Sequence, residues 1–287
     1  MRVLGGIEAG GSKCVCALGH APDDLEVSEI ATTTPEQTIG RVIEFFKVRR
    51  AVHAIGVASF GPVDLDPESA TYGHITWTPK LAWRNFDIAG MIGRALHVPV
   101  AIDTDVNAAA LAERRWGAAQ GLADFLYITV GSGIGAGGMA NGRLMHGRMH
   151  PEFGHVRVPH DWERDPFRGN CPYHGDCLEG LAAAPAIQAR WGQDPACLPD
   201  NHRAWDLEAR YLALGIVNAI CVLSPQRVIL GGGVMARAQL YPMIRGTVAE
   251  LLNGYLDAPQ IVPPSLGSRA GVLGAMALAD AALGEAS

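Results

Sequence analysis

Short runs of apolar residues recur along the chain, and each is followed by glycine, acidic or other polar residues. Their lengths and their content of Val, Ile and Ala are typical of buried β-strands. Because helical stretches separate most of these runs, the pattern indicates an α/β fold. The predicted strands cover residues 3–8, 14–18, 53–60, 98–102, 124–130, 134–139 and 227–230.

Hydrophobic residues at helical spacing fill the stretches between these strands. The clearest helix start is at Thr34, Pro35 and Gln37, which supply a cap, a proline at the first helical position and a capping-box partner. Asp87 precedes another helix as its cap. The predicted helices begin at residue 35, cover 88–96, 108–116, 206–223 and about 271–283, and include one from Glu179 or Leu181 that is broken at Pro185.

Two glycine turns, each between a pair of predicted strands, lie one in each half of the chain. Glycine lets backbone amides approach an anion closely, while serine adds a hydroxyl and lysine a charge. One such turn is also an ordinary hairpin, but its recurrence indicates two similar lobes that hold the phosphates of a nucleotide. The first glycine turn consists of Gly10, Gly11, Ser12 and Lys13, and the second consists of Gly131, Ser132 and Gly133.

A glycine triplet, formed by Gly231, Gly232 and Gly233, lies between a predicted strand and a predicted helix. A tight turn needs only one glycine, so three in succession indicate that the backbone comes close to a flat or anionic ligand. Thr129 lies at the end of the strand before the second glycine turn, where it can touch a phosphate or its Mg²⁺.

Two aspartates and an asparagine, Asp103, Asp105 and Asn107, lie at the junction of a predicted strand and a predicted helix. An Asp or Thr at such a junction is commonly an N-cap. Three polar groups exceed what capping requires, and ligands of open α/β sheets bind beyond the carboxyl ends of the strands. We therefore expect Asp105 to act as a catalytic base rather than only as a cap.

Potential metal ligands cluster in one stretch of the chain. Zn²⁺ prefers nitrogen and sulfur ligands in closed tetrahedral sites, so we expect a structural zinc ion rather than a catalytic one. Free thiols and surface histidines are the alternative. The ion would also fix Glu152 and Glu179, which could then contact a polyhydroxylated ligand together with one of the histidines. The predicted ligands are His155, Cys171, His174 and Cys177.

The chain has 287 residues, 48% of them hydrophobic, and a net charge of −6. The length suggests roughly two domains, which we place at residues 1–110 and 111–287, with the last helix packing back on the first. The acidic balance and the lack of a basic run argue against nucleic acid and anionic membranes as partners. The terminal apolar stretches are too short for a signal peptide or a membrane span. Two cysteines belong to the metal cluster and four lie in apolar surroundings, which indicates a cytoplasmic protein.

The motifs at residues 8–13, 105–107, 152–155, 171–177 and 231–233 together resemble the ROK family of sugar kinases. They occur in the order of that family over nearly the whole chain, which is most similar to the zinc-containing fructokinases of bacteria. The resemblance implies an actin-like ATPase (RNase H-like) fold of two lobes with a cleft between them. It also implies ATP with Mg²⁺ as the phosphoryl donor, and a homodimer.

The resemblance assigns roles to individual residues. Asp105 corresponds to the catalytic base of the family. The sugar ligands correspond to Gly61, Lys80, Thr104, Asp105, Glu152, His155 and Glu179. The ATP contacts correspond to both glycine turns, Thr129, Pro185, the glycine triplet, Val234 and Met235.

Four positions depart from the pattern of the family. Glu8 and Ser12 replace the usual Asp and Thr, while Lys80 and Thr104 stand where glucose-phosphorylating members tend to have Asn. Asn offers a donor and an acceptor in one plane, whereas Lys offers only donors and Thr a single hydroxyl. We therefore expect D-fructose as the acceptor and fructose 6-phosphate as the product. Glucose, mannose and N-acetylhexosamines stay open as alternatives.

Two further classes of function compete with a kinase. A sugar-responsive regulator of the same family would carry an N-terminal helix-turn-helix, for which the first strand, beginning at Val3, leaves no room. A zinc-stabilised sugar-binding protein without turnover would not need Asp105. Both are therefore weaker interpretations than a kinase.

Overall fold

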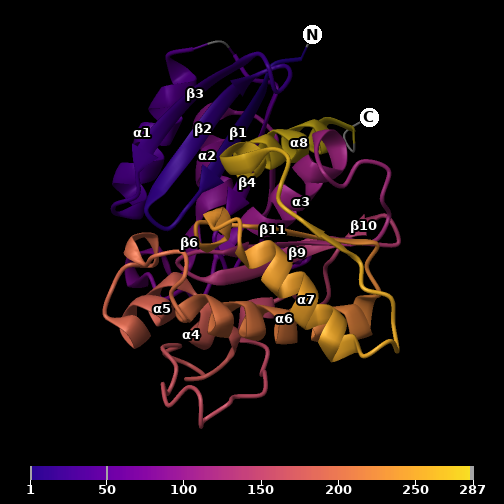
Figure 1. Cartoon of the computed structure of the whole chain (residues 1–287). Coiled ribbons are helices and arrows are strands. Elements are labelled where there is room, and N and C mark those ends of the chain that lie inside the picture. The colour runs from indigo at the N-terminus through magenta and orange to yellow at the C-terminus, as the bar shows by residue number, and fades with distance from the viewer. Residues whose placement is uncertain (1, 50, 285–287) are drawn as a thin grey trace. The chain divides into compact units, whose positions relative to one another are not determined.

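The computed structural model describes residues 2–49 and 51–284, and the chain divides into two compact units (Figure 1). Each unit is built around a five-stranded sheet. Unit 1 comprises the residues up to Gln120, Leu144–His150 and the residues from Ser268 on, and unit 2 comprises Gly121–Arg143 and Pro151–Gly267.

The sheet of unit 1 has the strand order β3-β2-β1-β4-β7. β1 is antiparallel to β2, and β2 is antiparallel to β3, whereas β4 and β7 continue parallel to β1. The short strands β5 and β6 form a separate pair. The bounds are β1 (Leu4–Ala9), β2 (Lys13–Gly19), β3 (Leu25–Ala31), β4 (Ala54–Ser59), β5 (His74–Ile75), β6 (Phe86–Asp87) and β7 (Val100–Thr104).

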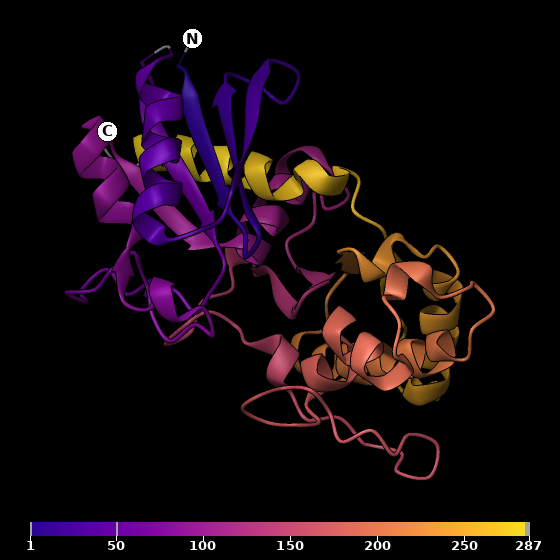
Figure 2. The ribbon, with the colours of Figure 1, turned by 90° about the vertical axis from the view of Figure 1, so that its left-hand side faces the viewer.

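Helices cover both faces of this sheet, and Figure 2 shows α8, in yellow, running across its strands. α1 and α2 form a core with Ile7, Ile55 and Val57 on one face, and α3 and α8 cover the other face. A Cβ at Gly56 would lie 1.8 Å from a backbone oxygen of α8, so glycine is required for this close packing. The helices are α1 (Pro35–Lys47), α2 (Ile88–Leu96), α3 (Asp105–Trp116) and α8 (Ala270–Gly284).

The two predicted helix caps of unit 1 are confirmed. Thr34 accepts a hydrogen bond from the amide of Gln37 at 3.4 Å, and Asp87 accepts one from Gly90 at 2.8 Å. The sequence does not predict β3, because this edge strand is largely exposed and carries glutamates among its apolar residues.

The sheet of unit 2 has the strand order β10-β9-β8-β11-β12. β9 is antiparallel to β8, whereas β11 and β12 run parallel to β8. Asn141 and Gly142 form the turn after β9 and have φ angles of 52° and 75°, and a type I′ turn requires positive φ at both positions. The bounds are β8 (Phe125–Val130), β9 (Ile134–Ala140), β10 (Arg143–Leu144), β11 (Arg227–Gly231) and β12 (Gln260–Val262).

The helices of unit 2 pack mainly around α6, which contacts α4 and α7. The predicted break near Pro185 lies at Ala183, and Pro185 occupies the first turn of the next helix, where a missing N–H is tolerated. Among the helices that the structure describes, none has the length and the hydropathy needed to cross a membrane. The helices are α4 (Leu178–Ala182), α5 (Ala184–Trp191), α6 (Ala204–Leu223) and α7 (Leu240–Leu252).

The two large sheets share one topology. In each, a hairpin edge is followed by two further strands that run parallel to its inner strand, so that β1, β2, β4 and β7 correspond to β8, β9, β11 and β12. This is the arrangement of an RNase H-like unit. The sequence predicts the recurrence of a strand, a glycine turn and a strand, and this unit is one part of a longer repeat that covers both sheets.

The border between the units differs from the predicted division at residue 110. That position lies in the middle of α3, and neighbouring residues such as Ala108 are buried against α8. Cutting there would separate a helix from its packing partner, so the structure keeps all of α3 in unit 1. Residues 144–150 also belong to unit 1. A single cut in the chain therefore cannot separate the two units.

Candidate functional site

The first glycine turn links β1 to β2 in unit 1 and is held by backbone hydrogen bonds. Gly10 N donates to Lys13 O at 2.9 Å, and Thr32 N donates to Ser12 O at 3.0 Å. A Cβ at Gly10 would lie 2.6 Å from Lys13 O, so this position needs glycine. Gly11 and Ser12 are exposed, which leaves backbone and a hydroxyl accessible to an anion.

Two lysines lie at or near this turn, and they have different surroundings. The ammonium of Lys13 is paired with Glu29 on β3. The side chain of Lys80 lies over the turn, with its Cε 3.0 Å and its Nζ 3.6 Å from the position of a Cβ on Gly11. Lys80 directly precedes a 3-10 helix, Leu81–Trp83.

Asp105 is the first residue of α3, directly after β7, and it is half-buried. The cap of α3 is Thr104, whose hydroxyl accepts a hydrogen bond from Asn107 N at 3.2 Å. Burial raises the pKa of Asp105 to about 6, although Val106 N donates to its Oδ1 at 2.9 Å. Because Thr104 performs the capping, Asp105 is available for chemistry, and its raised pKa suits a general base.

A buried polar network supports the start of α3. Oδ1 of Asp103 accepts from Thr104 N at 2.7 Å and from Asn107 Nδ2 at 2.9 Å. Oδ2 of Asp103 is 2.8 Å from Nε2 of His146, and this hydrogen bond raises the pKa of His146. Asp103 therefore orients the amide and backbone groups around Asp105. The sequence motif gives no sign of His146, which is 43 residues from Asp103.

Glu8, at the end of β1, is a second carboxylate with a raised pKa. Burial is the main cause, and the nearby negative charge of Asp105 adds to it, so that the pKa of Glu8 reaches about 7. Its buried Oε2 has no hydrogen-bond partner within the described parts of the chain. Two neighbouring carboxylates with an unsatisfied oxygen form a donor set that a hard divalent cation accepts.

Gly61 lies in a loop that a buried histidine supports. His150, 7% exposed, accepts a hydrogen bond from Val63 N at its Nε2 over 3.0 Å. A Cβ at Gly61 would lie 3.2 Å from the same ring. The ring therefore fixes the loop that carries the predicted sugar contact, and no feature of the sequence motif indicates this role for His150.

In unit 2, the second glycine turn lies beside the glycine triplet. β8 and β11 are neighbours, with Thr129 opposite Gly231, and a Cβ at Gly131 would lie 3.9 Å from Gly233 N. Gly232 has φ 94°, and a Cβ there would lie 2.3 Å from a backbone oxygen of β8. At the ends of the neighbouring strands β8 and β11, the structure thus brings together three groups that the sequence predicts to bind ATP: Thr129, the second glycine turn and the glycine triplet.

The remaining predicted ATP contacts lie close to these strand ends. Ser132 is exposed at the tip of the turn. Val234 and Met235 form a short 3-10 helix rather than the predicted helix, and their buried side chains leave only backbone for a ligand. Pro185 follows Ala184, whose N–H donates to Gly131 O at 2.8 Å.

Glu179 joins the metal stretch to the second glycine turn. Its Oε2 accepts a hydrogen bond from Ile134 N at 2.9 Å, and a Cβ at Gly133 would lie 2.7 Å from the same oxygen. Glu179 belongs to α4, whose N-cap is the metal-ligand candidate Cys177. One carboxylate thus connects the metal stretch with the backbone of the turn, and its other oxygen can contact a ligand.

The four predicted metal ligands converge, and the atoms that they offer lie within 4.8 Å of one another. Nδ1 of His155 is 3.3 Å from Nδ1 of His174, 3.7 Å from Sγ of Cys171 and 3.6 Å from Sγ of Cys177. A zinc tetrahedron with Zn–S of about 2.3 Å and Zn–N of about 2.05 Å has edges of about 3.3 Å and 3.6 Å for these pairs. The residues therefore fit a tetrahedral zinc ion.

The same geometry defines what the metal stretch can present to a ligand. Because Nδ1 of His155 faces the other ligand atoms, its Nε2 lies on the opposite side of the ring. Glu152 directly precedes the 3-10 turn that carries His155, and its carbonyl accepts from His155 N at 3.0 Å. The predicted pairing of a metal-bound imidazole with nearby carboxylates is therefore possible in unit 2.

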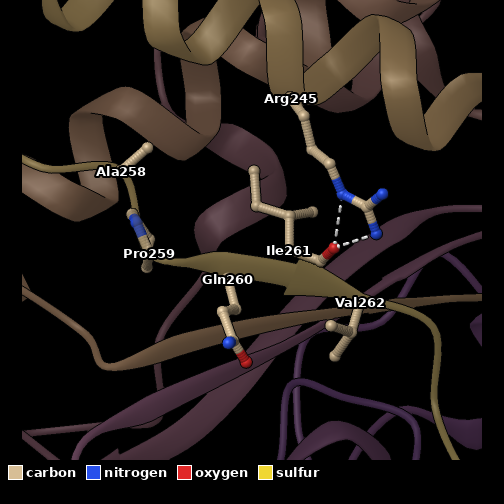
Figure 3. Close-up of a pocket in the computed structure, with 6 residues that line it drawn as sticks. All are labelled: Arg245, Ala258, Pro259, Gln260, Ile261 and Val262. Atoms are coloured by element: carbon tan, nitrogen blue, oxygen red, sulfur yellow. Dashed lines mark hydrogen bonds between the residues drawn. The ribbon is translucent and has the colours of Figure 1, made fainter.

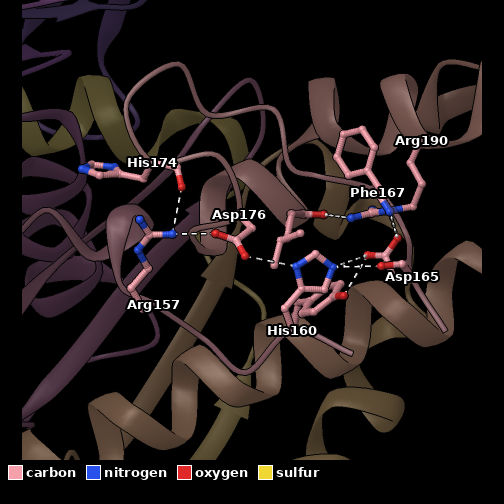
Figure 4. A network of polar contacts seen from close by, with 9 residues as sticks. Arg157, His160, Asp165, Phe167, His174, Asp176 and Arg190 are labelled. Atoms are coloured by element: carbon pink, nitrogen blue, oxygen red, sulfur yellow. Dashed lines mark hydrogen bonds and ion pairs between the residues drawn. The ribbon is translucent and has the colours of Figure 1, made fainter. Parts of the chain in front are cut away.

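A polar network supports this stretch from behind (Figure 4). Nη1 of Arg157 donates to His174 O at 2.8 Å and to Asp176 Oδ1 at 2.6 Å. His160 bridges Asp176 Oδ2, at 3.2 Å, and the carbonyl of Asp165, at 3.0 Å. The segment from Cys171 to Cys177, which carries three of the metal ligands, is therefore connected by hydrogen bonds to the loop that contains Asp165.

The far end of the network is a buried ion pair. The side chains of Asp165 and Arg190 are 1% and 6% exposed, and Arg190 Nε donates to Asp165 Oδ1 at 3.0 Å. Tyr211 OH donates to the other oxygen of Asp165 at 2.8 Å. Asp165 is thus a buried charge whose stability depends on both partners.

A pocket elsewhere in unit 2 contains no predicted site residue (Figure 3). The guanidinium of Arg245 donates two hydrogen bonds to the carbonyl of Ile261, so its charge is already engaged. This pocket follows the edge strand β12 and is lined by Arg245, Ala258, Pro259, Gln260, Ile261 and Val262.

Two RNase H-like sheets with corresponding glycine turns, and a carboxylate of raised pKa at a strand end, define a nucleotide-dependent phosphotransferase of the actin-like ATPase fold. The chain belongs to the ROK family, whose sequence profile matches residues 4–282. The family and the fold class expected from the motifs are therefore confirmed.

Known relatives cover nearly the whole chain. It is 43% identical to a fructokinase of Zymomonas mobilis, over 98% of this chain and 97% of that protein. It is 42% identical to a fructokinase of Pediococcus pentosaceus, over 98% and 99%. The crystal structure of a ROK hexokinase from Thermus thermophilus superimposes with a TM-score of 0.82 at 28% identity and covers 99% of this chain and 100% of that one.

Proposed function

We propose that the protein is an ATP-dependent hexose kinase that phosphorylates the primary hydroxyl of D-fructose to give fructose 6-phosphate. The observation that carries this proposal is Asp105, a half-buried carboxylate at the end of β7 whose capping role is taken by Thr104. The identity of more than 40% to two fructokinases over nearly the full length supports the choice of sugar.

The reaction is a direct transfer. The primary hydroxyl oxygen of the sugar forms a bond to the γ-phosphorus of ATP, and the bond from that phosphorus to the bridging oxygen breaks, so that ADP leaves. Asp105 accepts the proton of the hydroxyl. With a pKa of about 6, this carboxylate is deprotonated at neutral pH and can act as the base. The rest of catalysis is positioning and charge neutralisation, because the transition state is loose.

The other predicted residues bind the two substrates. We assign contacts with sugar hydroxyls to the Gly61 loop, Glu152, His155 and Glu179. Thr104 supports Asp105 from the cap of α3. Both glycine turns, Thr129, Pro185 and the segment from Gly231 to Met235 bind ATP.

Two metal ions belong to the proposal. Glu8 would hold Mg²⁺ that arrives with ATP, and its unsatisfied oxygen supports this assignment. When bound, Mg²⁺ neutralises the negative charge of the phosphates. His155, Cys171, His174 and Cys177 would hold a structural zinc ion. We also propose a cytoplasmic homodimer. The net charge of −6 supports the proposed lack of nucleic-acid and anionic-membrane partners.

A coupled assay of ADP release tests the proposal. The ratio kcat/KM is measured with Mg-ATP for fructose, mannose, glucose and N-acetylmannosamine under one condition, with sugar-free hydrolysis as the baseline. We expect fructose to give the highest value. A value for glucose tenfold above that for fructose would overturn the sugar but keep the kinase. Turnover of no hexose would refute the kinase itself.

A further inference from the structure

Lys80 lies at a place that its expected role as a sugar ligand does not explain. Its ammonium lies over the first glycine turn, 3.6 Å from the position of a Cβ on Gly11. The turn offers backbone amides and the Ser12 hydroxyl, groups that suit a phosphate. An ammonium at this distance contributes the positive charge that such a turn otherwise lacks.

The other lysine of the turn does not fill this need. Lys13 has its ammonium paired with Glu29 on the neighbouring strand. Throughout residues 2–49 and 51–284, by contrast, no hydrogen bond or ion pair engages the ammonium of Lys80. Lys80 is therefore the cation of this turn that is available to an anionic ligand.

The backbone of Lys80 is held rigidly, although its side chain is exposed. The 3-10 helix that follows it is anchored by Trp83, whose indole N–H donates to Thr33 O at 3.0 Å. Trp83 is 2% exposed and packs edge-on against Phe60 and Phe86. The stem of Lys80 therefore starts from a fixed point and reaches back over the turn.

We propose that Lys80 is a catalytic residue that binds the phosphoryl group during its transfer, and not a ligand of the sugar hydroxyls. This inference rests on the proposed kinase function. Lys80 stays protonated throughout and donates N–H groups to the phosphoryl oxygens, so it forms and breaks no covalent bond. A compact ammonium suits this role as a point charge.

The proposal predicts how the kinetic constants divide. A group that holds the transferring phosphoryl acts mainly in the transition state, so its loss lowers kcat, by about 10²- to 10³-fold for one electrostatic donor. A sugar ligand that binds ground state and transition state equally would raise KM and leave kcat unchanged. Binding of the phosphorylated product should also suffer more than binding of the free sugar.

The test compares Lys80→Met and Lys80→Arg with Lys47→Met, a control at the exposed end of α1. For Lys80→Met we expect kcat to fall at least 100-fold while KM for fructose stays within threefold. By calorimetry, Kd for fructose 6-phosphate should rise tenfold or more and Kd for fructose less than threefold. Lys80→Arg should recover part of kcat, and Lys47→Met should match the wild type. A tenfold rise of KM with kcat within threefold would overturn the proposal.

Chemical labelling separates this inference from the kinase assignment. Only Lys13, Lys47 and Lys80 are lysines, so acetylation can be followed by peptide mass spectrometry with Lys47 as an internal reference. We expect Mg-ATP to slow labelling of Lys80 at least fivefold and fructose alone to leave it unchanged. Protection without turnover of any hexose would refute the kinase and keep the phosphate site. Turnover without protection would refute the phosphate site alone.

Discussion

Replacing Asp105 with Asn separates a catalytic base from a helix cap. Asn keeps the shape of the side chain and an oxygen that can accept from Val106 N, while Thr104 continues to cap α3. It cannot accept the proton of the sugar hydroxyl. We therefore expect Asp105→Asn to lower kcat by about 10²- to 10⁴-fold, the range for loss of a general base.

Although Asp105→Asn should lower kcat, it should raise the free energy of unfolding at alkaline pH. Burial raises the pKa of Asp105 from 3.8 to about 6, so the folded protein holds this proton more tightly than the unfolded chain. This tighter proton binding stabilises the folded wild type fully below pH 3.8, and the stabilisation is lost as pH rises through about 6. A shift of about two units corresponds to at most roughly 3 kcal/mol. Asn carries no charge, so at pH 8 the variant should be more stable than the wild type.

Urea unfolding at pH 8 and pH 5 measures this difference. We expect the gain from Asp105→Asn to be largest at pH 8 and to shrink by about half at pH 5, because the carboxylate is then mostly protonated. The acid limb of kcat/KM, with an apparent pKa of about 6 in the wild type, should vanish from the residual activity. Thr104→Ala is the matched control and should cost about 1 kcal/mol as a lost cap. A variant that is less stable at pH 8 and keeps kcat within tenfold would refute the catalytic role.

Two further predictions concern unit 2. Cys177→Ser should lower the zinc content, and it should raise KM for the sugar because Glu179 loses its anchor, whereas Cys197→Ser, outside the cluster, should leave both unchanged. Elemental analysis that finds no zinc in the native protein would contradict this prediction. Asp165→Asn should cost about 3–5 kcal/mol in urea unfolding because it leaves Arg190 buried without its counter-charge. Asp200→Asn breaks an ion pair whose carboxylate is 77% exposed and should cost less than about 1 kcal/mol, so equal effects would contradict this account.

Much of the fold could be predicted from local signals. The caps at Thr34 and Asp87, the hairpin at Asn141 and the repeated glycine turn all have short-range causes, and the structure confirms them. β3 and β12 could not be predicted, because β3 is largely exposed and carries glutamates, and β12 has only three residues. The border between the two units depends on how the helices pack, and no local change in composition along the sequence indicates it.

The candidate site shows the same limit. The type and the spacing of residues indicate Asp105 and the four metal ligands, because their chemistry is concentrated in short motifs. His146 and His150 support Asp103 and the Gly61 loop across separations of 43 and 87 residues, so a motif cannot reveal them. The proximity of Lys80 to Gly11 likewise depends on long-range contacts of Trp83 with Thr33, Phe60 and Phe86, which anchor the 3-10 helix after Lys80.

The repeated topology explains why the glycine turn occurs twice and the proposed base only once. The hairpin edge recurs in both sheets, so each unit has a glycine turn at the equivalent position. β7 ends at Thr104 and is followed directly by Asp105, whereas the equivalent strand, β12, is followed by Pro263 and Pro264. Proline has no titratable group and no N–H, so this end of unit 2 cannot supply a base. What unit 2 adds is the metal stretch between β10 and β11, where Glu179 links a metal knuckle to its own glycine turn. The shared topology thus gives both units the same framework of strands and glycine turn, and in the proposed kinase the residues that differ between the units supply the acceptor chemistry.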